Sequence, residues 1–474
     1  MGIIRYCIYT SHAMSLEKIK VAIVGSGPAA FYAAGHLQKK LGDRVFIDMF
    51  EKLPTPHGLV RSGVAPDHQK IKSVARVYDK IASSPGFRFF GLVEFGKHVT
   101  LDNLQSRYHQ IVFATGAQTD RKMEIPGENI TGSHTATEFV AWYNAHLEYT
   151  DLDFDFSGKR VVIVGVGNVA VDVARILSLT RGEMEKTDIA DYALEKLAAS
   201  RIKEIQMLGR RGPAQAAFTN PELRELENLE DADLLVLPDE AQPDPLTLED
   251  LESGVNKAAG MKIEMIRKAS ERVPSKSKKI IIRFLVSPIE ITAGKDNRVK
   301  SVKIVKNRLY RSDDGSLRPS PTDKIEEIPA DLVFRSVGYR GIVLQDVPFD
   351  KNSGVIPNER GRVLDKTGGN PIQGLYTTGW IKRGATGVIG TNKTDSGETV
   401  KCMIEDIERG NTLHPEFTSP ESIKQLLEEK HISYNEWLRV DSFEKEKGEK
   451  LGRPRIKVSR LEEIIGILEK SRMG

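Results

Sequence analysis

Two stretches of this chain share one hydrophobic pattern. The apolar run Val21–Val24 leads into a segment of the form G-x-G-x-x-A, Gly25–Ala30. The run Val161–Val164 leads into a second such segment, Gly165–Ala170, 140 positions later. Continuous apolar runs rich in β-branched residues are typical of strands buried in a parallel sheet. Helix-forming residues follow both segments, so the pattern predicts two strand–turn–helix units.

Other hydrophobic periodicities predict the elements between and after these units. We expect strands at 45–50, 87–90, 93–95, 110–117, 204–208, 280–292, 300–311 and 332–339, and helices at 69–83, 135–146, 169–179, 221–229 and 394–409. The strand at 332–339 ends in a glycine turn and is expected to return the chain to the first domain. Residues 420–474 predict helices with polar connections and hold no catalytic motif.

The two glycine-rich segments have the chemistry of dinucleotide-binding turns. The first glycine, Gly25 or Gly165, permits the tight turn, and the second, Gly27 or Gly167, lets the backbone approach a pyrophosphate. A small third residue, Ala30 in the first copy, lets the helix pack on the strand, and the helix N-terminus presents free N–H groups to phosphates. A single match arises by chance, but two in this context predict two bound dinucleotides, as in a flavoprotein reductase.

An acidic residue ends the second predicted strand. Glu51 follows residues 45–50, where a carboxylate can accept hydrogen bonds from both hydroxyls of an adenosine ribose. The alternative is a surface glutamate at a strand end. The segment 52–68, rich in Pro and Gly, predicts an ordered loop that is well placed to wrap a cofactor.

The second unit differs where the first has its carboxylate. Its strand at 204–208 is followed by Gly209, Arg210 and Arg211. A carboxylate would repel a 2′-phosphate, whereas guanidinium groups bind it with charge-assisted hydrogen bonds. This substitution favours NADP over NAD, the alternative being a solvated arginine pair.

A further glycine-rich stretch lies near the end of the chain. Residues 379–390 lead into the helix predicted at 394–409. Such a helix N-terminus can hold negative charge on a reduced isoalloxazine or its ribityl chain.

Charge segregates between the second unit and the end of its domain. From Glu222 to Glu252 the chain is acidic, with Arg224 as its one base. The segment that follows, residues 257–283, is basic through Lys257, Lys262, Arg267, Lys268, Arg272, Lys276, Lys278, Lys279 and Arg283, against Glu264 and Glu271. Two solvated faces would give this pattern, and so would a surface that steers an acidic partner.

Composition removes several classes of function. With 474 residues, two or three domains are expected. The net charge of +3 does not by itself indicate nucleic acid or membrane binding, and no apolar run approaches the about 20 residues of a spanning helix. Cys7 and Cys402 form no CxxC or Cys/His cluster, so no protein-bound metal or cluster is expected. Residues 1–14 are not expected to be a signal peptide, and we expect a cytoplasmic protein.

These observations define a fold class. We expect an α/β protein with two Rossmann-like dinucleotide-binding domains built on parallel sheets, the second inserted into the first. The expected domains are an FAD-binding domain over 1–117 and 337–474, and an NADP-binding domain with a charged insert over 118–336.

Longer strings resemble the adrenodoxin reductase family of NADPH–ferredoxin reductases, especially its bacterial, mycobacterial-type members. They are Gly25–Tyr32, Glu51–His68, Gly165–Leu177, Gly209–Leu226 and Gly379–Asn392. The resemblance covers nearly the whole chain. It implies FAD in the first domain, NADPH in the second, and single-electron delivery to a small iron–sulfur ferredoxin after hydride transfer from NADPH to FAD.

The resemblance also implies binding residues. For FAD these are Gly25, Gly27, Ala29, Ala30, Glu51, Leu59, Val93, Gly379, Trp380, Gly387, Val388 and Ile389. For NADP they are Val166, Gly167, Asn168, Val169, Arg210, Arg211, Glu222 and, where the two cofactors meet, Gly387. His68 and Asp172 match polar positions near the flavin or the nicotinamide channel and are the candidate catalytic residues.

The chain departs from the family pattern at Val166, Ala385 and His57, which affects affinity more than the reaction. The absence of a redox-active cysteine pair argues against a thioredoxin-reductase type. An NADPH diaphorase, an oxygenase-type flavoprotein acting on a small molecule, and a non-enzymatic flavin-binding protein remain as alternatives.

Overall fold

A computed structural model describes residues 18–254, 257–428 and 431–473. Residues 1–14, which are not expected to be a signal peptide, lie outside these ranges, as does Cys7 among them. The chain forms two compact units. The first contains 1–54, 77–116 and 343–434, and the second contains 55–76, 117–342 and 435–474. No helix within the described ranges is long and apolar enough to cross a membrane.

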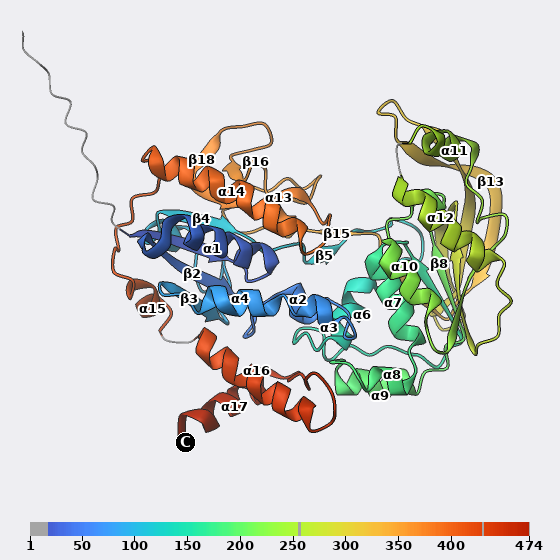
Figure 1. Ribbon diagram of the computed structural model, residues 1–474, viewed down its shortest axis with the longest axis horizontal. Helices are drawn as coiled ribbons and strands as arrows, with labels where there is room; N and C mark the ends of the chain where they lie inside the picture. Colours follow the sequence, from blue (N-terminus) through green and yellow to red (C-terminus); the bar gives the residue numbers. More distant parts are fainter. Residues whose placement is uncertain (1–17, 255–256, 429–430, 474) are drawn as a thin grey trace, which may run out of the picture. The chain divides into compact units, whose positions relative to one another are not determined.

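The first unit is built on a seven-stranded sheet in the order β16-β17-β18-β4-β1-β2-β3 (Figure 1). Strands β18, β4, β1, β2 and β3 are parallel, and β17 and β16 add antiparallel at one edge. Helices α1 and α14 pack against each other in this unit. The strands are β1 Ile19–Val24, β2 Val45–Glu51, β3 Phe87–Gly91, β4 Gln110–Phe113, β16 Asn358–Glu359, β17 Arg362–Leu364 and β18 Pro371–Thr377. Its helices are α1 Pro28–Leu41, η1 Gly42–Arg44, α4 Ala75–Ala82, α5 Leu101–Gln105, α13 Trp380–Arg383, α14 Thr391–Glu408 and α15 Ser422–Leu426.

The second unit is built on a six-stranded parallel sheet in the order β6-β14-β7-β8-β10-β9. The strands are β6 Ser133–Thr135, β7 Arg160–Val164, β8 Glu204–Leu208, β9 Ala232–Val236, β10 Lys278–Arg283 and β14 Leu332–Arg335. Short strands β5 Thr119–Asp120 and β15 Tyr339–Arg340 pair antiparallel. The helices are α2 Leu59–Ser62, α3 Gln69–Lys72, α6 Ala136–Tyr143, α7 Asn168–Ser178, α8 Arg181–Met184, α9 Asp191–Ala198, η2 Pro213–Gln215, α10 Asn220–Glu227, α11 Pro245–Glu252, α12 Lys257–Ser270, α16 Tyr434–Glu449 and α17 Leu461–Met473.

Two apolar cores hold the second unit together. One joins side chains of β7, β8 and β10, such as Ile163 and Ile282, to the helices α6, α7, α9, α10 and α12. The other joins Val162, Val164 and Leu208 to an antiparallel sheet of β11 Val286–Ala293, β12 Val299–Arg311 and β13 Leu317–Pro329. Alternate residues of β7 therefore face opposite cores, which explains why this strand is apolar almost throughout.

The expected fold class is confirmed, and several expected elements are wrong in detail. The strand expected at 280–292 is two strands in different sheets, because Leu285 has a φ of +53° that turns the chain between β10 and β11. Residues 93–95 form no strand, since Leu92 also has a positive φ. The helix expected at 69–83 is two helices, α3 and α4.

The strand β14 belongs to the second unit, and the return of the chain to the first unit follows it. It ends at Arg335, between β6 and β7 in the parallel sheet of the second unit, and the chain enters the first unit again at Val343. The compact units also assign 55–76 and 435–474 to the second unit, whereas we expected them in the FAD-binding domain.

Candidate functional site

In the first unit, the glycine-rich turn leaves space where a phosphate would lie. Gly25 has a φ of +101°, and a Cβ added there would lie 2.6 Å from the carbonyl oxygen of Ala114. This position therefore requires glycine. A Cβ added to Gly27, by contrast, would meet no atom within 4 Å. Ala30 is fully buried at the start of α1, so the arrangement fits a pyrophosphate at the helix N-terminus.

Glu51 lies at the end of β2, beside this turn. One carboxylate oxygen accepts hydrogen bonds from the Ser26 N–H at 3.1 Å and the Ser26 hydroxyl at 2.6 Å. The other accepts from the Leu53 N–H at 3.1 Å. Burial raises the pKa of Glu51, and these hydrogen bonds act in the opposite direction. These hydrogen bonds fix the carboxylate in place. Each oxygen can still accept a further hydrogen bond, so the carboxylate fits the expected role as an acceptor for ribose hydroxyls.

Three further expected FAD residues belong to the same unit. Val93 is buried and donates its N–H to the carbonyl oxygen of Glu51 at 2.9 Å. Gly379 has a φ of +78°, and a Cβ added there would lie 2.6 Å from the Cβ of Ala29. Trp380 begins α13, and its indole N–H donates to the carbonyl oxygen of Thr386. The structure thus brings Gly379 against Ala29, on the first glycine-rich helix.

The residues Gly387, Val388 and Ile389 form the turn before α14. Val388 is 58% exposed, and its N–H donates to the Thr391 hydroxyl at 3.2 Å. This turn is in the first unit, whereas Leu59 is a half-exposed residue of α2 in the second unit. The FAD contact of Leu59 and the NADP contact of Gly387 stay predictions.

The second glycine-rich turn repeats the geometry of the first. The Gly165 N–H donates to Leu208 at 2.9 Å, as the Gly25 N–H donates to Phe50 at 2.8 Å. A Cβ added to Gly167 would also meet no atom within 4 Å. Ala170 is fully buried, as Ala30 is in the first copy.

Neighbouring segments hold the second turn in place. The carbonyl oxygen of Val166 accepts from the N–H groups of Ala217 and Phe218, both at 3.0 Å. The side chain of Asn168 accepts from the Thr219 N–H at 3.0 Å. Val169 follows in α7 and packs against the core. The four expected NADP residues, 166–169, therefore lie in one turn that hydrogen bonds and packing hold in place.

Phe50 and Leu208 accept equivalent hydrogen bonds from the two turns, and the residues that follow them differ in charge. The residue after Phe50 is Glu51, and the residue after Leu208 is Gly209, followed by Arg210 and Arg211. Arg210 is exposed, and burial lowers the pKa of Arg211, with the neighbouring Arg210 charge adding to that effect. Among the described residues, no hydrogen bond or ion pair engages either guanidinium. Two neighbouring positive charges therefore have no anionic partner among the described residues, which fits a 2′-phosphate.

A partly buried polar cluster of the second unit contains both candidate catalytic residues. The imidazole Nε2 of His68 lies 2.8 Å from a carboxylate oxygen of Glu225, and Nδ1 lies 4.0 Å from Asp172. Arg175, on the turn of α7 after Asp172, pairs with Asp172 and with Asp67. It also lies 3.4 Å from Glu225.

Burial alone lowers the pKa of His68, but the hydrogen bond to Glu225 and nearby carboxylates raise it, and the net shift is upward. Glu222 belongs to the same cluster. Burial, then the charges of Asp172 and Glu225, raise the pKa of Glu222 to about 7. Donor atoms of His68, Asp172 and Glu222 lie within 4.8 Å of one another. Arg175 already supplies a cation to this cluster, and we assign no metal to it.

Sequence reasoning missed several members of these sites. The cluster around His68 also contains Arg175, Glu225 and Asp67. Of these, Arg175 could have been found from the sequence, because residues three positions apart in a helix, such as Asp172 and Arg175, lie on the same face and can pair. The missed residues Lys382 and Asp395 lie beside Gly379 in the first unit, 13 positions apart.

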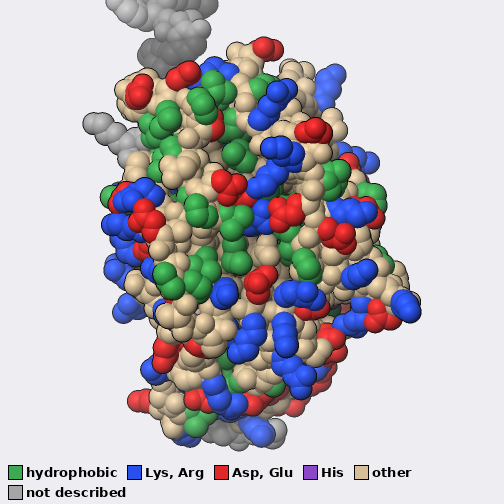
Figure 2. Space-filling model, turned by 90° about the vertical axis from the view of Figure 1, so that its right-hand side faces the viewer, with side chains coloured by type: hydrophobic (Ala, Val, Ile, Leu, Met, Phe, Trp, Pro, Cys, Tyr) green, Lys and Arg blue, Asp and Glu red, His purple; other side chains and the backbone are tan. Residues whose placement is uncertain are grey.

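The basic segment 257–283 is largely engaged within the protein. Lys262 donates to the carbonyl oxygen of Ala216 and lies over the ring of Phe218. Lys276 and Lys278 donate to backbone carbonyl oxygens. Arg267 and Lys268 pair with Glu264, and Arg267 also pairs with Glu271. Arg283 is buried between Glu240 and Glu326. Figure 2 shows Lys and Arg side chains interspersed with Asp and Glu on this face of the second unit. Most of the segment thus has a structural role.

Comparisons with known proteins agree with this geometry. Residues 19–207 match the family described as pyridine nucleotide-disulphide oxidoreductase. The chain is 44% identical over 461 residues to NADPH-ferredoxin reductase FprA of Mycobacterium tuberculosis, covering 94% of this chain and 98% of that protein. It is 38% identical over 475 residues to the mitochondrial NADPH:adrenodoxin oxidoreductase of Homo sapiens, covering 97% and 94%.

A solved structure is similar over its whole length. FprA of Mycobacterium tuberculosis in complex with NADPH superposes with a TM-score of 0.89 at 43% identity, covering 96% of this chain and 100% of that chain. Sequence and structure agree over nearly all of this chain, including both glycine-rich turns. The chain therefore belongs to the NADPH–ferredoxin reductase family that includes FprA and adrenodoxin reductase.

Proposed function

We propose that the protein is an FAD-containing NADPH–ferredoxin reductase, which passes electrons from NADPH to an iron–sulfur ferredoxin. The observation that carries the proposal is the pair of equivalent turns, one followed by Glu51 and the other by Arg210 and Arg211. The names and the NADPH complex of the relatives support it.

In this proposal the first unit holds FAD. The turn at Gly25–Ala30 binds the pyrophosphate at the N-terminus of α1, and the Glu51 carboxylate accepts hydrogen bonds from the ribose hydroxyls. Gly379, Trp380 and the turn at 387–389 hold the flavin end. Bound FAD takes two electrons together as a hydride and releases them one at a time.

The second unit holds NADP(H). Residues 166–169 bind the pyrophosphate, and Arg210 and Arg211 bind the 2′-phosphate with charge-assisted hydrogen bonds. Glu222, His68 and Asp172 are proposed for the nicotinamide end. There the imidazole of His68 is hydrogen-bonded to Glu225, which favours its protonated form, and Arg175 pairs with Asp172.

The proposal includes an acidic ferredoxin and a cytoplasmic location. Basic side chains outside the internal pairs, such as the exposed Lys279 on β10, are available to meet acidic groups of a partner. Cys402 is buried and free, which suits a reducing compartment.

The direct test mixes the purified protein, NADPH, a ferredoxin and cytochrome c. We expect a yellow protein whose bound flavin is bleached by NADPH and whose cytochrome reduction depends on added ferredoxin. Cytochrome reduction at the same rate without ferredoxin would leave a diaphorase. A flavin that NADPH does not bleach would leave a non-enzymatic flavin-binding protein.

A further inference from the structure

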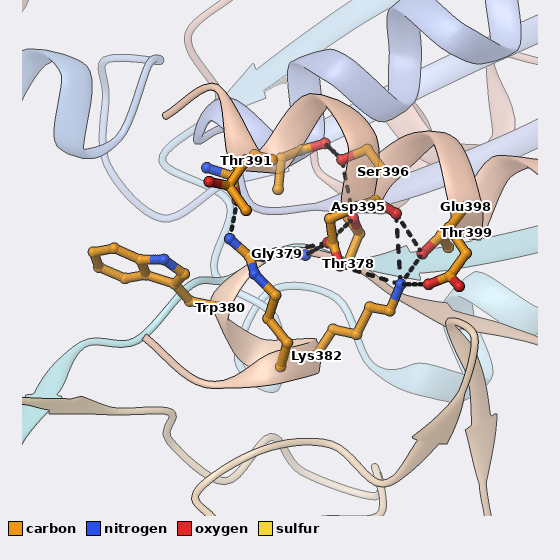
Figure 3. A network of polar contacts seen from close by, with 12 residues as sticks. Thr378, Gly379, Trp380, Lys382, Thr391, Asp395, Ser396, Glu398 and Thr399 are labelled. Carbon is orange, nitrogen blue, oxygen red and sulfur yellow. Dashed lines mark hydrogen bonds and ion pairs between the residues drawn. The ribbon is translucent and has the colours of Figure 1, made fainter. Parts of the chain in front are cut away.

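A buried carboxylate of α14 holds the turn at Gly379. Asp395 accepts hydrogen bonds from the Gly379 N–H at 2.6 Å and from the Thr378 hydroxyl at 3.0 Å (Figure 3). Its side chain is 9% exposed. Gly379 directly precedes α13, which begins at Trp380. By binding the Gly379 N–H, the carboxylate holds the start of this short helix in place.

Two cations flank the same carboxylate. The Lys382 ammonium, with its side chain 6% exposed, lies 3.2 Å from one oxygen of Asp395. The Arg383 guanidinium lies 3.4 Å from the other. Lys382 also contacts Glu398 at 2.7 Å, but the Glu398 side chain is 46% exposed, and the Gly379 N–H donates to Asp395 instead. Asp395 is therefore the buried counter-charge of two cations.

The next residue of α14, Ser396, contacts the glycine-rich helix α1. The Ser396 hydroxyl donates to the carbonyl oxygen of Ala29 at 2.9 Å and lies 3.0 Å from the Thr378 hydroxyl (Figure 3). Gly379 has no room for a Cβ beside Ala29. Asp395 and Ser396 thus join the turn at Gly379 to the glycine-rich helix α1, and both of these segments belong to the first unit.

We propose that Asp395 is a positioning residue for the flavin, which fixes the Gly379–Trp380 turn and, with Lys382 and Arg383, sets the charge that the flavin experiences. This inference rests on the proposed function, since it requires FAD in the first unit. A negative charge near a flavin disfavours the electron-rich reduced form, whereas cations favour it. Asp395 therefore lowers the reduction potential by offsetting Lys382 and Arg383.

The test separates the hydrogen bond from the charge. Asp395→Asn keeps an oxygen for the Gly379 N–H and removes the charge, whereas Asp395→Ala removes both. We expect D395N to retain FAD and to have a more positive midpoint potential than the parent protein. We expect D395A to raise the FAD dissociation constant about tenfold or more, because a buried charge-assisted hydrogen bond is lost. Visible circular dichroism of the bound flavin should change in D395A.

Glu398→Gln is the matched control, because it removes the other carboxylate on Lys382 without touching Gly379. We expect the parent's potential and FAD affinity in E398Q. Arg383→Gln provides a second measurement if D395N does not fold, and it should shift the potential in the negative direction.

Parental potentials in both D395N and R383Q, or the same shift in E398Q as in D395N, would overturn the inference. A parent protein that binds no FAD would overturn the proposed function as well. A parent that binds FAD while both D395N and R383Q keep the parental potential overturns the inference alone.

Discussion

The imidazole of His68 and the carboxylate of Glu225 are joined by a 2.8 Å hydrogen bond between residues 157 positions apart. His68 ends the loop before α3, and Glu225 lies on α10, so the bond links the 55–76 segment to the nucleotide-binding part of the second unit. Burial lowers the pKa of the imidazole, whereas the hydrogen bond to Glu225 raises it, and the net shift is upward.

Replacing Glu225 by Gln should therefore lower the pKa of His68. Burial and the Arg175 charge would remain, and both act downward. Titration of the imidazole by NMR measures the shift, and Glu227→Gln in the same helix is the control. Because the folded-state pKa of His68 is raised, its contribution to stability is present below the unfolded pKa and is lost as pH rises through the folded value. The loss of stability in E225Q should accordingly be larger at pH 5 than at pH 9. A His68 titration that E225Q leaves unchanged would contradict the assignment.

Glu222 should make the second unit less stable as pH rises through 7. Its pKa is raised to about 7, so folding favours the protonated form, and stability falls between the ordinary carboxyl value of 4.5 and about 7. Glu222→Gln removes the cost of ionising a buried carboxyl. At pH 8 the variant should unfold at a higher temperature than the parent, and its free energy of unfolding should be larger by about 1–3 kcal/mol. At pH 5 the two proteins should unfold at the same temperature. Equal midpoints at pH 8 would show that Glu222 ionises freely.

Local pattern predicted the parts of this protein that depend on neighbouring residues. The two turns follow from strand, glycine and helix signals within ten positions each, and the structure gives them the same hydrogen bond to the adjacent strand, from Gly25 and from Gly165. The family resemblance supplied the expected cofactors. The residue contacts with those cofactors stay predictions.

Long-range relationships could not be predicted in this way. The meeting of His68 with Glu225, and of Asp395 with Gly379, depends on how elements pack, and helix periodicity does not specify a partner in a distant segment. Leu285 has an ordinary apolar side chain, and nothing in its type signals the positive φ that separates β10 from β11. Similarly, a basic run such as 257–283 does not show which of its charges are satisfied internally.

Replacement of both Arg210 and Arg211 by Ala should weaken the binding of NADPH more than the binding of NADH. No described side chain pairs with either guanidinium, so the folded protein loses little, whereas a 2′-phosphate loses charge-assisted hydrogen bonds worth about 1.5–3 kcal/mol each. We expect the KM for NADPH to rise by about 10- to 100-fold or more, with a small change for NADH. Arg201→Ala, an exposed arginine of the same unit, is the control. Equal effects on both nucleotides would remove the 2′-phosphate assignment.

The rate with an acidic ferredoxin should fall as ionic strength rises. Screening shortens the range of attraction between opposite charges from about 10 Å at 0.1 M to about 3 Å at 1 M salt, and association steered by charge slows accordingly. Stopped-flow measurement of ferredoxin reduction at several salt concentrations checks this. Lys279→Glu should flatten the dependence, since Lys279 is an exposed member of the basic segment whose side chain pairs with no residue that the structure describes. Lys262→Gln should leave the salt slope unchanged, because Lys262 contacts the carbonyl of Ala216. A flat profile in the parent protein counts against electrostatic docking.

The second glycines of the two turns provide a pair of variants that control each other. Gly27 and Gly167 have φ values of −77° and −101°, which alanine adopts, and an added Cβ meets no atom within 4 Å at either position. Alanine there should leave the apoprotein as stable as the parent or more stable by about 0.4–1 kcal/mol, because the unfolded chain loses freedom. The methyl group would instead occupy the space proposed for a pyrophosphate. We therefore expect Gly27→Ala to weaken FAD binding with the apoprotein intact, and Gly167→Ala to weaken NADPH binding while the flavin is retained. Titration of each variant with each nucleotide separates the two sites. If G27A affected NADPH alone, or G167A affected FAD alone, the assignment of the cofactors to the two turns would be reversed.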